Sequence, residues 1–376
     1  MINRRQLSFA ATASLLTSFT PVRAQADSKI VLGQSAALTG PAAQLGIQFN
    51  AGANVFFDLL NAKGGINRRL VELKALDDGY DPARCAENTR NLVSQDVFAL
   101  FGYIGTPTSV AALPQILKDR VPFIAPFTGA MSLREPMHKN VFHLRASYND
   151  ETALIVKQLD SLGLQRIAVF HQNDAYGKAG LDGVNKALDA LSRKTVGVAT
   201  VERNSVEVAD AAKALAASKA DAIVMVSAYK SCAAFIRAAR AAGFGGQFYN
   251  VSFVGTQALI DELGKDAAGV VVSQVMPSPY NMATPIAREF AAAIKAHGKG
   301  VQANYSSMEG YVAARLVTDG LTRAGVNPNR DSFIRGLESI GNQNYSGFAV
   351  NLSATNHVAS SFVDKSMLTA DGKVRT

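Results

Sequence analysis

The chain has 376 residues, of which 48% are hydrophobic and 18% charged, and its formal net charge is +8. This length is too great for one compact core and predicts two domains of ordinary size, while the composition is that of a globular protein. The positive excess is spread along the sequence without a basic block. Nucleic-acid binding is therefore not expected.

The first 26 residues carry the pattern of a signal peptide. Arg4 and Arg5 form a positive region, residues 7–19 form a short apolar region, and small residues allow cleavage after Ala24 or Ala26. The apolar region is too short to span a bilayer, and no later run of 18 apolar residues appears. We expect a mature protein in the periplasm, exported by the Sec route or by the twin-arginine route that paired arginines can serve.

Two cysteines, Cys85 and Cys232, remain in the mature sequence. They lie on predicted helices in different halves of the chain, and neither belongs to a CxxC motif. An oxidising compartment would permit a disulfide between them. The sequence favours two separate buried thiols.

Strands and helices alternate regularly after the signal. Short apolar runs such as Val97–Phe101 and Ala222–Val226 are typical of parallel strands buried on both faces. The first array has predicted strands at 29–32, 71–75, 97–101, 121–124 and 141–145. The second has them at 166–170, 195–201, 222–226, 248–251 and 270–275. A proline-containing link at 276–280 leads to helices at 284–297, 306–324 and 332–340, and then to short antiparallel strands from residue 348. This alternation predicts an α/β fold with parallel sheets and helices on both faces.

Two loops follow neighbouring strands of the first array, at Gly102–Thr108 and at Pro126–Ala130. Ligands of open α/β sheets bind outside the carboxyl ends of the strands, where these loops should meet. Thr106 stands at the head of a predicted helix, where a hydroxyl, free backbone N–H groups and a positive dipole end suit a carboxylate. The alternative is that both loops are ordinary polar turns.

Catalytic and cofactor motifs are absent from the sequence. It contains no GxGxxG after a strand, no GxxxxGK[ST], no HExxH and no GxSxG. The five histidines form no i, i+4 pair, and Asp77-Asp78 is interpreted as a solvated turn rather than an acid–base pair. We therefore expect no cofactor, no metal site and no enzymatic activity.

Several short motifs together carry a family resemblance. In chain order they are Ala37–Pro41, Asn61–Ile66, Asp77-Asp78, Asp81-Pro82, Pro126, Tyr176-Gly177, Ala238–Gly243 and Gly269–Val272. Over its mature length the chain resembles type I periplasmic solute-binding proteins of the branched-chain amino acid (Leu/Ile/Val) family.

The resemblance implies two Rossmann-like lobes with parallel-rich sheets, joined by three hinge crossovers. Lobe one would comprise residues 27–145 plus 280–345, and lobe two residues 146–279 plus 346–376. It also implies a ligand in the interlobe cleft, closure by hinge motion and delivery to the membrane subunits of an ABC permease. A monomer is the expected oligomeric state.

The family's ligand site is carried over residue by residue. Thr106 takes the place of a serine that binds the ligand carboxylate, and Tyr176 and Tyr229 match tyrosines of lobe two that close over the ligand. Leu45 stands where the family often has an aromatic wall. The second loop contributes Thr128, Gly129 and Ala130, and further apolar walls are expected from Tyr103, Phe127 and Phe253.

Three positions depart from the family pattern. Ser252 replaces the glutamate that pairs with the ligand ammonium, and Gly129 replaces a threonine that helps to hold the amino group. Tyr80 replaces a disulfide cysteine. A buried ammonium without a counter-charge is costly.

The ligand is therefore expected to be a small carboxylate, either an amino acid or an aromatic or aliphatic organic acid. An amino acid would need Asp174 or a main-chain carbonyl to receive its ammonium. Two other functions remain open, a ligand-sensing receptor subunit and an exported hydrolase. The hydrolase would require a base within hydrogen-bonding reach of Thr106 or Ser252.

Overall fold

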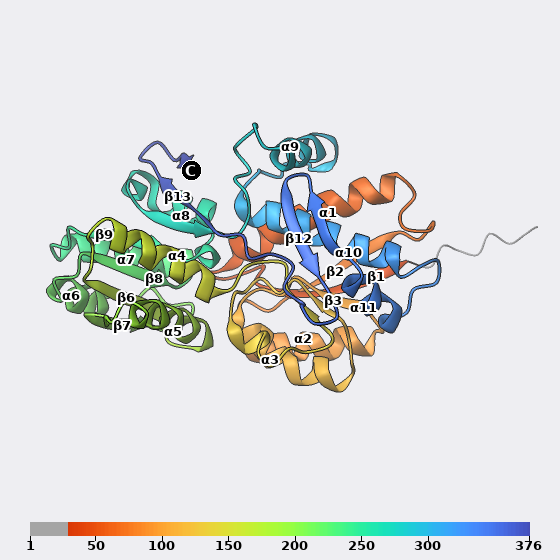
Figure 1. Ribbon diagram of the computed structural model, residues 1–376, viewed down its shortest axis with the longest axis horizontal. Coiled ribbons are helices and arrows are strands. Elements are labelled where there is room, and N and C mark those ends of the chain that lie inside the picture. The colour runs from red at the N-terminus through yellow and green to blue at the C-terminus, as the bar shows by residue number, and fades with distance from the viewer. Residues whose placement is uncertain (1–28) are drawn as a thin grey trace, which may run out of the picture.

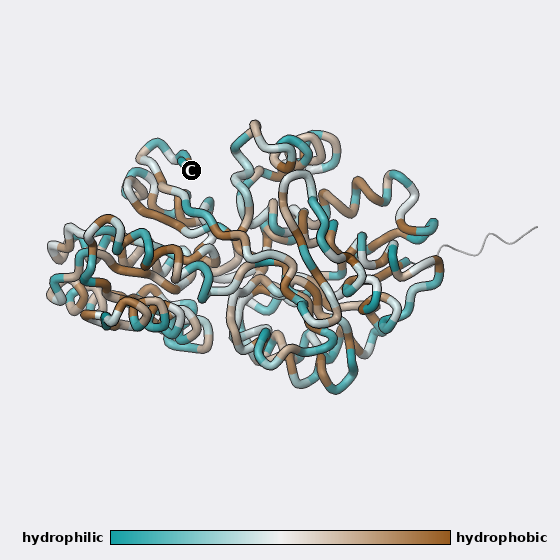
Figure 2. The backbone as a smooth tube through the Cα atoms, viewed as in Figure 1, coloured by the Kyte–Doolittle hydropathy of each residue, from teal (hydrophilic) through white to brown (hydrophobic). Residues whose placement is uncertain are grey.

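The computed structural model describes residues 29–376, which form two lobes side by side (Figure 1). The predicted signal peptide, residues 1–26, lies outside the described residues. Within 29–376, no helix is long and apolar enough to cross a membrane. Hydrophobic segments run through the middle of each lobe and hydrophilic ones over its outer loops (Figure 2).

The first lobe is built on a five-stranded parallel sheet. Its strands lie in the order β2 (Val71–Asp77), β1 (Ile30–Ala36), β3 (Ala99–Phe101), β4 (Phe123–Ile124) and β5 (Val141–Phe142). The helices of this lobe are α1 (Ala43–Ala62), α2 (Pro82–Ser94), α3 (Thr106–Lys118), α9 (Pro285–His297), α10 (Tyr305–Arg323) and α11 (Arg330–Glu338), with a 3-10 turn at Met131–Leu133.

The second lobe is built on a seven-stranded sheet, parallel except at the edge formed by the last two strands. The order is β14 (Val374–Arg375), β13 (Asp364–Leu368), β10 (Val271–Gln274), β9 (Gln247–Asn250), β8 (Ala222–Val226), β6 (Ile167–Gln172) and β7 (Gly197–Val201). Its helices are α4 (Tyr148–Ser161), α5 (Ala175–Asp189), α6 (Ala209–Ala217), α7 (Tyr229–Ala241) and α8 (Thr256–Leu263), with 3-10 turns at Ser252–Val254 and Gly264–Ala267.

Three segments cross between the lobes, and the predicted fold class is confirmed. They are residues 143–147, 275–284 and 353–363. The hairpin of β11 (Gly341–Tyr345) and β12 (Phe348–Leu352) precedes the third crossover, and His143 beside the first lobe pairs with Val358. We propose on this pairing that the last lobe boundary lies near residue 360 rather than at 345.

The helices begin where the sequence supplies caps. Asp81 accepts from the Arg84 amide with Pro82 in the first turn, and Ser147 forms a reciprocal capping box with Asp150. Helix α3 begins at Thr106, the residue predicted to stand at its head. Its N-cap is Gly105 with a φ of 95°, a conformation that glycine adopts without strain.

Cys85 and Cys232 are both free and buried, as predicted. Burial raises the pKa of both thiols. They are inert core groups rather than reactive ones.

Helices α1 and α10 pack with their backbones in near contact at two glycines. A Cβ on Gly52 would lie 1.8 Å from the carbonyl oxygen of Ser307, and one on Gly310 would lie 2.0 Å from that of Phe49. A side chain at either position forces the helices apart, and this contact fixes α10, whose Glu309 bonds Arg145 of the first crossover.

We therefore expect Gly52→Ala to lower the free energy of unfolding by about 1–3 kcal/mol, because overpacking strains a rigid backbone contact. Urea denaturation against Gly245→Ala measures this. A Cβ added to Gly245 would have no neighbouring atom within 4 Å, and the backbone φ of this residue is not positive, so Gly245 is the matched control. Equal stability of both variants would contradict the packing argument.

Candidate functional site

Side chains from both lobes meet in one buried group between them, which we call the interlobe cluster. Its members from the first lobe are Tyr80, Thr106, Phe127 and Thr128; those from the second lobe are Tyr148, Gln172, Tyr176 and Phe253. Each is fully or almost fully inaccessible to solvent. The loops after β3 and β4 do meet, as predicted, because parallel neighbouring strands end at the same edge.

The two predicted threonines are in direct contact. Thr106 Oγ1 lies 2.7 Å from Thr128 Oγ1, and the Ala130 amide donates to Thr128 Oγ1 at 3.2 Å. Only one of the two hydroxyl protons is used in their mutual bond, so the other is left to donate. Thr106 is also the first residue of α3. In its first turn Pro107 has no N–H and the Ser109 amide donates to the Gly105 carbonyl, so the amides of Thr106 and Thr108 are the donors left at this helix end.

Aromatic rings form the body of the interlobe cluster. Phe253 is central, with its ring centroid 4.6 Å from that of Tyr176, 5.7 Å from that of Phe127 and 5.9 Å from that of Tyr80. The Tyr148 ring lies 5.4 Å from the Tyr176 ring. The hydroxyls of Tyr148 and Tyr176 have no hydrogen-bond partner. Burial raises the pKa of Tyr148 to about 12, so its hydroxyl stays protonated and able to donate.

A buried ion-pair network lies behind the interlobe cluster. Arg145 donates to both carboxylate oxygens of Glu309 on α10, at 2.7 and 2.6 Å, and its Nη1 donates to Ser252 Oγ at 3.1 Å. Its guanidinium lies 4.0 Å from the centroid of the Phe127 ring. Burial lowers the pKa of Arg145, but Glu309 outweighs it and holds that pKa above the ordinary value.

Glu151 on α4 completes the network. Its carboxylate accepts from the Ser252 amide at 2.7 Å, from Ser252 Oγ at 3.0 Å and from Ser273 Oγ at 2.5 Å. Burial raises the pKa of Glu151, against the opposing effects of Arg145 and these donors. Ser252 Oγ therefore accepts from Arg145 and donates to Glu151, so both of its partners are protein side chains.

This contact bears on the hydrolase alternative, because Glu151 is a base within reach of Ser252. The same carboxylate is held by two further donors, and Arg145 also donates to Ser252 Oγ. Thr106 Oγ1 has a threonine hydroxyl, and no base, as its partner. In a catalytic nucleophile–base pair, a third group orients the base. Here the third group is Arg145, and it donates to Ser252, the nucleophile of such a pair, instead of orienting Glu151. This arrangement disfavours a hydrolase.

Three more of the predicted site residues are Leu45, Tyr229 and Gly129. Leu45 contacts Gly255, whose added Cβ would lie 2.4 Å from the leucine Cδ2, and the Gln44 amide donates to the Tyr229 hydroxyl at 3.5 Å. Both contacts join the lobes. At Gly129 an added Cβ would lie 2.6 Å from the Tyr148 amide nitrogen, so the position has no room for a side chain.

Tyr103 and Asp174 correct two of our expectations. The Tyr103 hydroxyl accepts from Thr89, and its ring packs on Phe123 in a separate core under α2 and α3, so we remove Tyr103 from the proposed site. Asp174 caps α5 by accepting from the Tyr176 and Gly177 amides, and its other oxygen accepts from Gln172. Its Oδ2 also lies 4.0 Å from Arg203 Nη1, so a ligand ammonium would have to compete with that cation.

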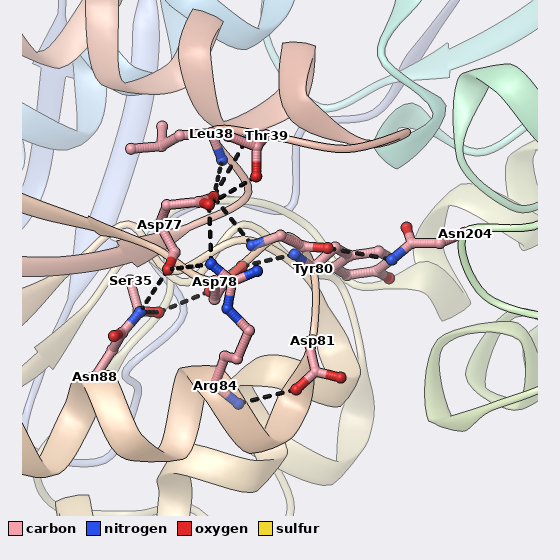
Figure 3. A network of polar contacts seen from close by, with 11 residues as sticks. Ser35, Leu38, Thr39, Asp77, Asp78, Tyr80, Asp81, Arg84, Asn88 and Asn204 are labelled. Carbon is pink, nitrogen blue, oxygen red and sulfur yellow. Dashed lines mark hydrogen bonds and ion pairs between the residues drawn. The ribbon is translucent and has the colours of Figure 1, made fainter.

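Tyr80 reaches the interlobe cluster because of the turn that follows β2 (Figure 3). Asp78 is fully buried and accepts from Ser35 and from the Tyr80 amide, at 2.7 and 2.8 Å. Asp77 accepts from the Leu38, Thr39 and Gly79 amides and pairs with Arg84. The Asp77-Asp78 pair was predicted to form a solvated turn. Both carboxylates instead accept several hydrogen bonds from the protein, and Asp78 is fully buried.

Asn204 of the second lobe touches this turn, donating to the Gly79 carbonyl at 3.1 Å (Figure 3). Next to it, Gln172 donates to the Tyr80 hydroxyl at 3.3 Å. These two bonds and the aromatic contacts of Phe253 link the two lobes.

The two aspartates have opposite pKa shifts. Burial raises the pKa of Asp78 to about 6. Burial also acts to raise the pKa of Asp77, but the hydrogen bonds from Thr39, Leu38 and Gly79 prevail and lower it to about 2. Stability from the Asp78 proton is therefore present below the unfolded value of about 4 and is lost as the pH rises through 6.

We expect Asp78→Asn to remove this pH dependence while keeping the bond from the Tyr80 amide to Oδ1; the bond with Ser35 would reverse, with the asparagine Nδ2 donating to the hydroxyl. Relative to the unchanged protein, the variant should gain about 2–3 kcal/mol between pH 4 and pH 8, from the shift of 3.8 to about 6. Urea unfolding at both pH values measures it. Asp77→Asn is the comparison variant: the pKa of Asp77 lies below this window, and its charge is only a smaller cause of the Asp78 shift, so this variant should follow the unchanged protein much more closely than Asp78→Asn does. A parallel response of both variants would contradict the assignment.

Comparisons with known proteins place this geometry in a family. The family model described as "Periplasmic binding protein" matches residues 29–364. The Leu/Ile/Val-binding protein of Escherichia coli (strain K12) is 25% identical over 265 residues, covering 69% of this chain and 70% of the relative.

Two solved structures are similar over almost the whole fold. A possible leucine/isoleucine/valine-binding protein from Rhodopirellula baltica SH 1 has 34% identity and a TM-score of 0.89, covering 93% of this chain and 96% of that one. A substrate-binding periplasmic protein from Ralstonia solanacearum has 31% identity and a TM-score of 0.87, covering 92% and 99%. These relatives are solute-binding proteins rather than enzymes, and this chain belongs to the periplasmic binding protein family.

Proposed function

We propose that the protein is the exported substrate-binding component of an ABC importer, and that it takes up a small carboxylate-bearing ligand between its lobes. The lobes would close over the ligand by hinge motion at the three crossovers and present it to the permease membrane subunits. Family membership and the names of the relatives support a solute-binding role.

The observation that carries the proposal is the contact of Thr106 with Thr128 at the start of α3. A carboxylate placed there would receive a spare hydroxyl proton and free backbone N–H groups at the positive end of a helix dipole. No side-chain carboxylate of the described residues bonds to either hydroxyl. The position thus has the donors of an anion site without an anion of its own.

A second observation concerns charge behind the Thr128 loop. Arg134 is buried and donates through Nη2 to the carbonyls of Thr128, Arg145 and Ala146, but its Nε and Nη1 have no partner. Burial lowers the pKa of Arg134 to about 10, which still leaves it charged at neutral pH. A cation bonded to carbonyls alone favours an anion nearby.

The experiment is a thermal-shift panel on refolded, ligand-stripped mature protein, with amino acids, aromatic and aliphatic acids, keto acids and amides. A ligand at 100 times its Kd should add about 2.7 kcal/mol of stability. A rise with one class of carboxylates is the expected result, and silence across the panel would refute the proposal.

Replacing Thr106 by valine should weaken binding of whichever acid responds by about 10- to 100-fold, because a hydrogen bond to a charged group contributes about 1.5–3 kcal/mol. Calorimetric titration measures the loss. Thr322→Val on the exposed face of α10 is the control for the same substitution in a helix. Unchanged affinity in Thr106→Val would place the carboxylate elsewhere.

A further inference from the structure

We infer that the ligand is an acid without an amino group, an inference that rests on the proposed function and names its ligand class. It follows from which polar atoms of the interlobe cluster are already engaged and which are spare. Buried polar groups need partners, so the spare atoms describe the complementary groups of the ligand.

The carboxylates that adjoin the interlobe cluster are engaged by the protein itself. Glu309 gives both oxygens to Arg145, and Glu151 gives both to Ser252 and Ser273. Asp174 gives one oxygen to α5 and the other to Gln172. A ligand ammonium would have to compete with these donors for the carboxylate oxygens.

The protein also supplies a cation at this place. Arg145 lies against the Phe127 ring and donates to Ser252 Oγ, so a guanidinium already occupies the space between the Thr128 loop and Ser252. A ligand ammonium placed there would compete with Arg145 for the Ser252 oxygen. Ser252 and Glu151 together make a satisfied protein–protein contact rather than a receptor for ammonium.

Donors are the groups left over. The hydroxyls of Tyr148 and Tyr176 have no partner, the Tyr80 hydroxyl accepts from Gln172 and keeps its own proton, and the Thr106–Thr128 pair has one proton free. Apart from hydroxyl oxygens, the spare acceptor among these residues is Gln172 Oε1. This set matches a ligand with several acceptor oxygens and at most one donor, such as a 2-oxo acid, a hydroxy acid or an aromatic acid.

The walls agree with a compact apolar body. Phe127, Phe253 and the rings of Tyr80, Tyr148 and Tyr176 surround the polar atoms. An aromatic ring or a short branched chain would pack against such rings once the lobes had parted to admit it.

The test compares matched ligands that differ only in the amino group. Leucine is paired with 4-methyl-2-oxopentanoate and 4-methylpentanoate, and phenylalanine with phenylpyruvate and 3-phenylpropanoate. Calorimetric titration of the ligand-stripped mature protein should give an affinity at least about 100-fold higher for an acid than for its amino-acid partner, because the unpaired ammonium is desolvated.

Each outcome has a distinct meaning. An amino acid that binds as tightly as its partner, or more tightly, overturns this inference and leaves the proposed function standing. Failure of both members for every skeleton overturns the proposed function and this inference with it.

Two variants test the spare donors directly. Tyr148→Phe and Tyr176→Phe should each weaken acid binding by about tenfold or more. Tyr176→Phe should do so without lowering the melting temperature of the free protein, because the Tyr176 hydroxyl has no partner to lose. Tyr103→Phe, whose hydroxyl lies in the other core, is the matched control and should leave the affinity unchanged. Full acid affinity in both site variants would overturn the donor assignment.

Discussion

The buried guanidinium of Arg145 is the interaction on which the arrangement of the cleft depends. It sits in the first crossover between the lobes, and it contacts a helix of the first lobe through Glu309 and a turn of the second through Ser252. An ion removed from water needs its full set of partners, and removal of one partner of such a pair typically destabilises a protein by about 3–5 kcal/mol. Here Glu309, Ser252 and the Phe127 ring supply those partners.

This arrangement also shapes what the cleft can bind. Both oxygens of Glu151 accept hydrogen bonds from Ser252 and Ser273, so a ligand would have to compete with these serines for them. The threonine and tyrosine hydroxyls remain as donors, and Arg134 adds positive charge behind the Thr128 loop. Ligand selectivity would then depend on polar groups whose hydrogen bonds are made within the protein, such as Glu151, as much as on the hydroxyls that can still donate to a ligand.

Much of the fold could be predicted from the sequence because the signals are local. Buried apolar runs such as Ala222–Val226 and caps such as Asp81-Pro82 act over a few residues. The meeting of Thr106 and Thr128 was also predictable, because it follows from a general property of parallel sheets. The ion-pair network was not predictable in this way, since Arg145 and Glu309 are 164 positions apart and no periodicity or motif links them.

Other residues of the site show further limits of sequence reasoning. Tyr148 and Gln172 were missed because no local pattern marks them, and Tyr103 was placed wrongly because residues at a strand end alternate between the two faces of the sheet. Two adjacent acids suggested solvent, yet Asp78 is fully buried and holds Tyr80 in a left-handed conformation with a φ of 62°. The deciding partner is Ser35 on the neighbouring strand β1, and a one-dimensional pattern does not reveal such cross-strand partners.

The most direct measurement is a crystal structure of the mature protein with the tightest-binding acid. Our account predicts the carboxylate within hydrogen-bonding distance of Thr106 Oγ1 or Thr128 Oγ1, with Tyr148 or Tyr176 donating to the ligand and Glu151 still bound to Ser252. A ligand that lies outside the interlobe cluster, or one whose amino group has displaced Ser252 from Glu151, would contradict it.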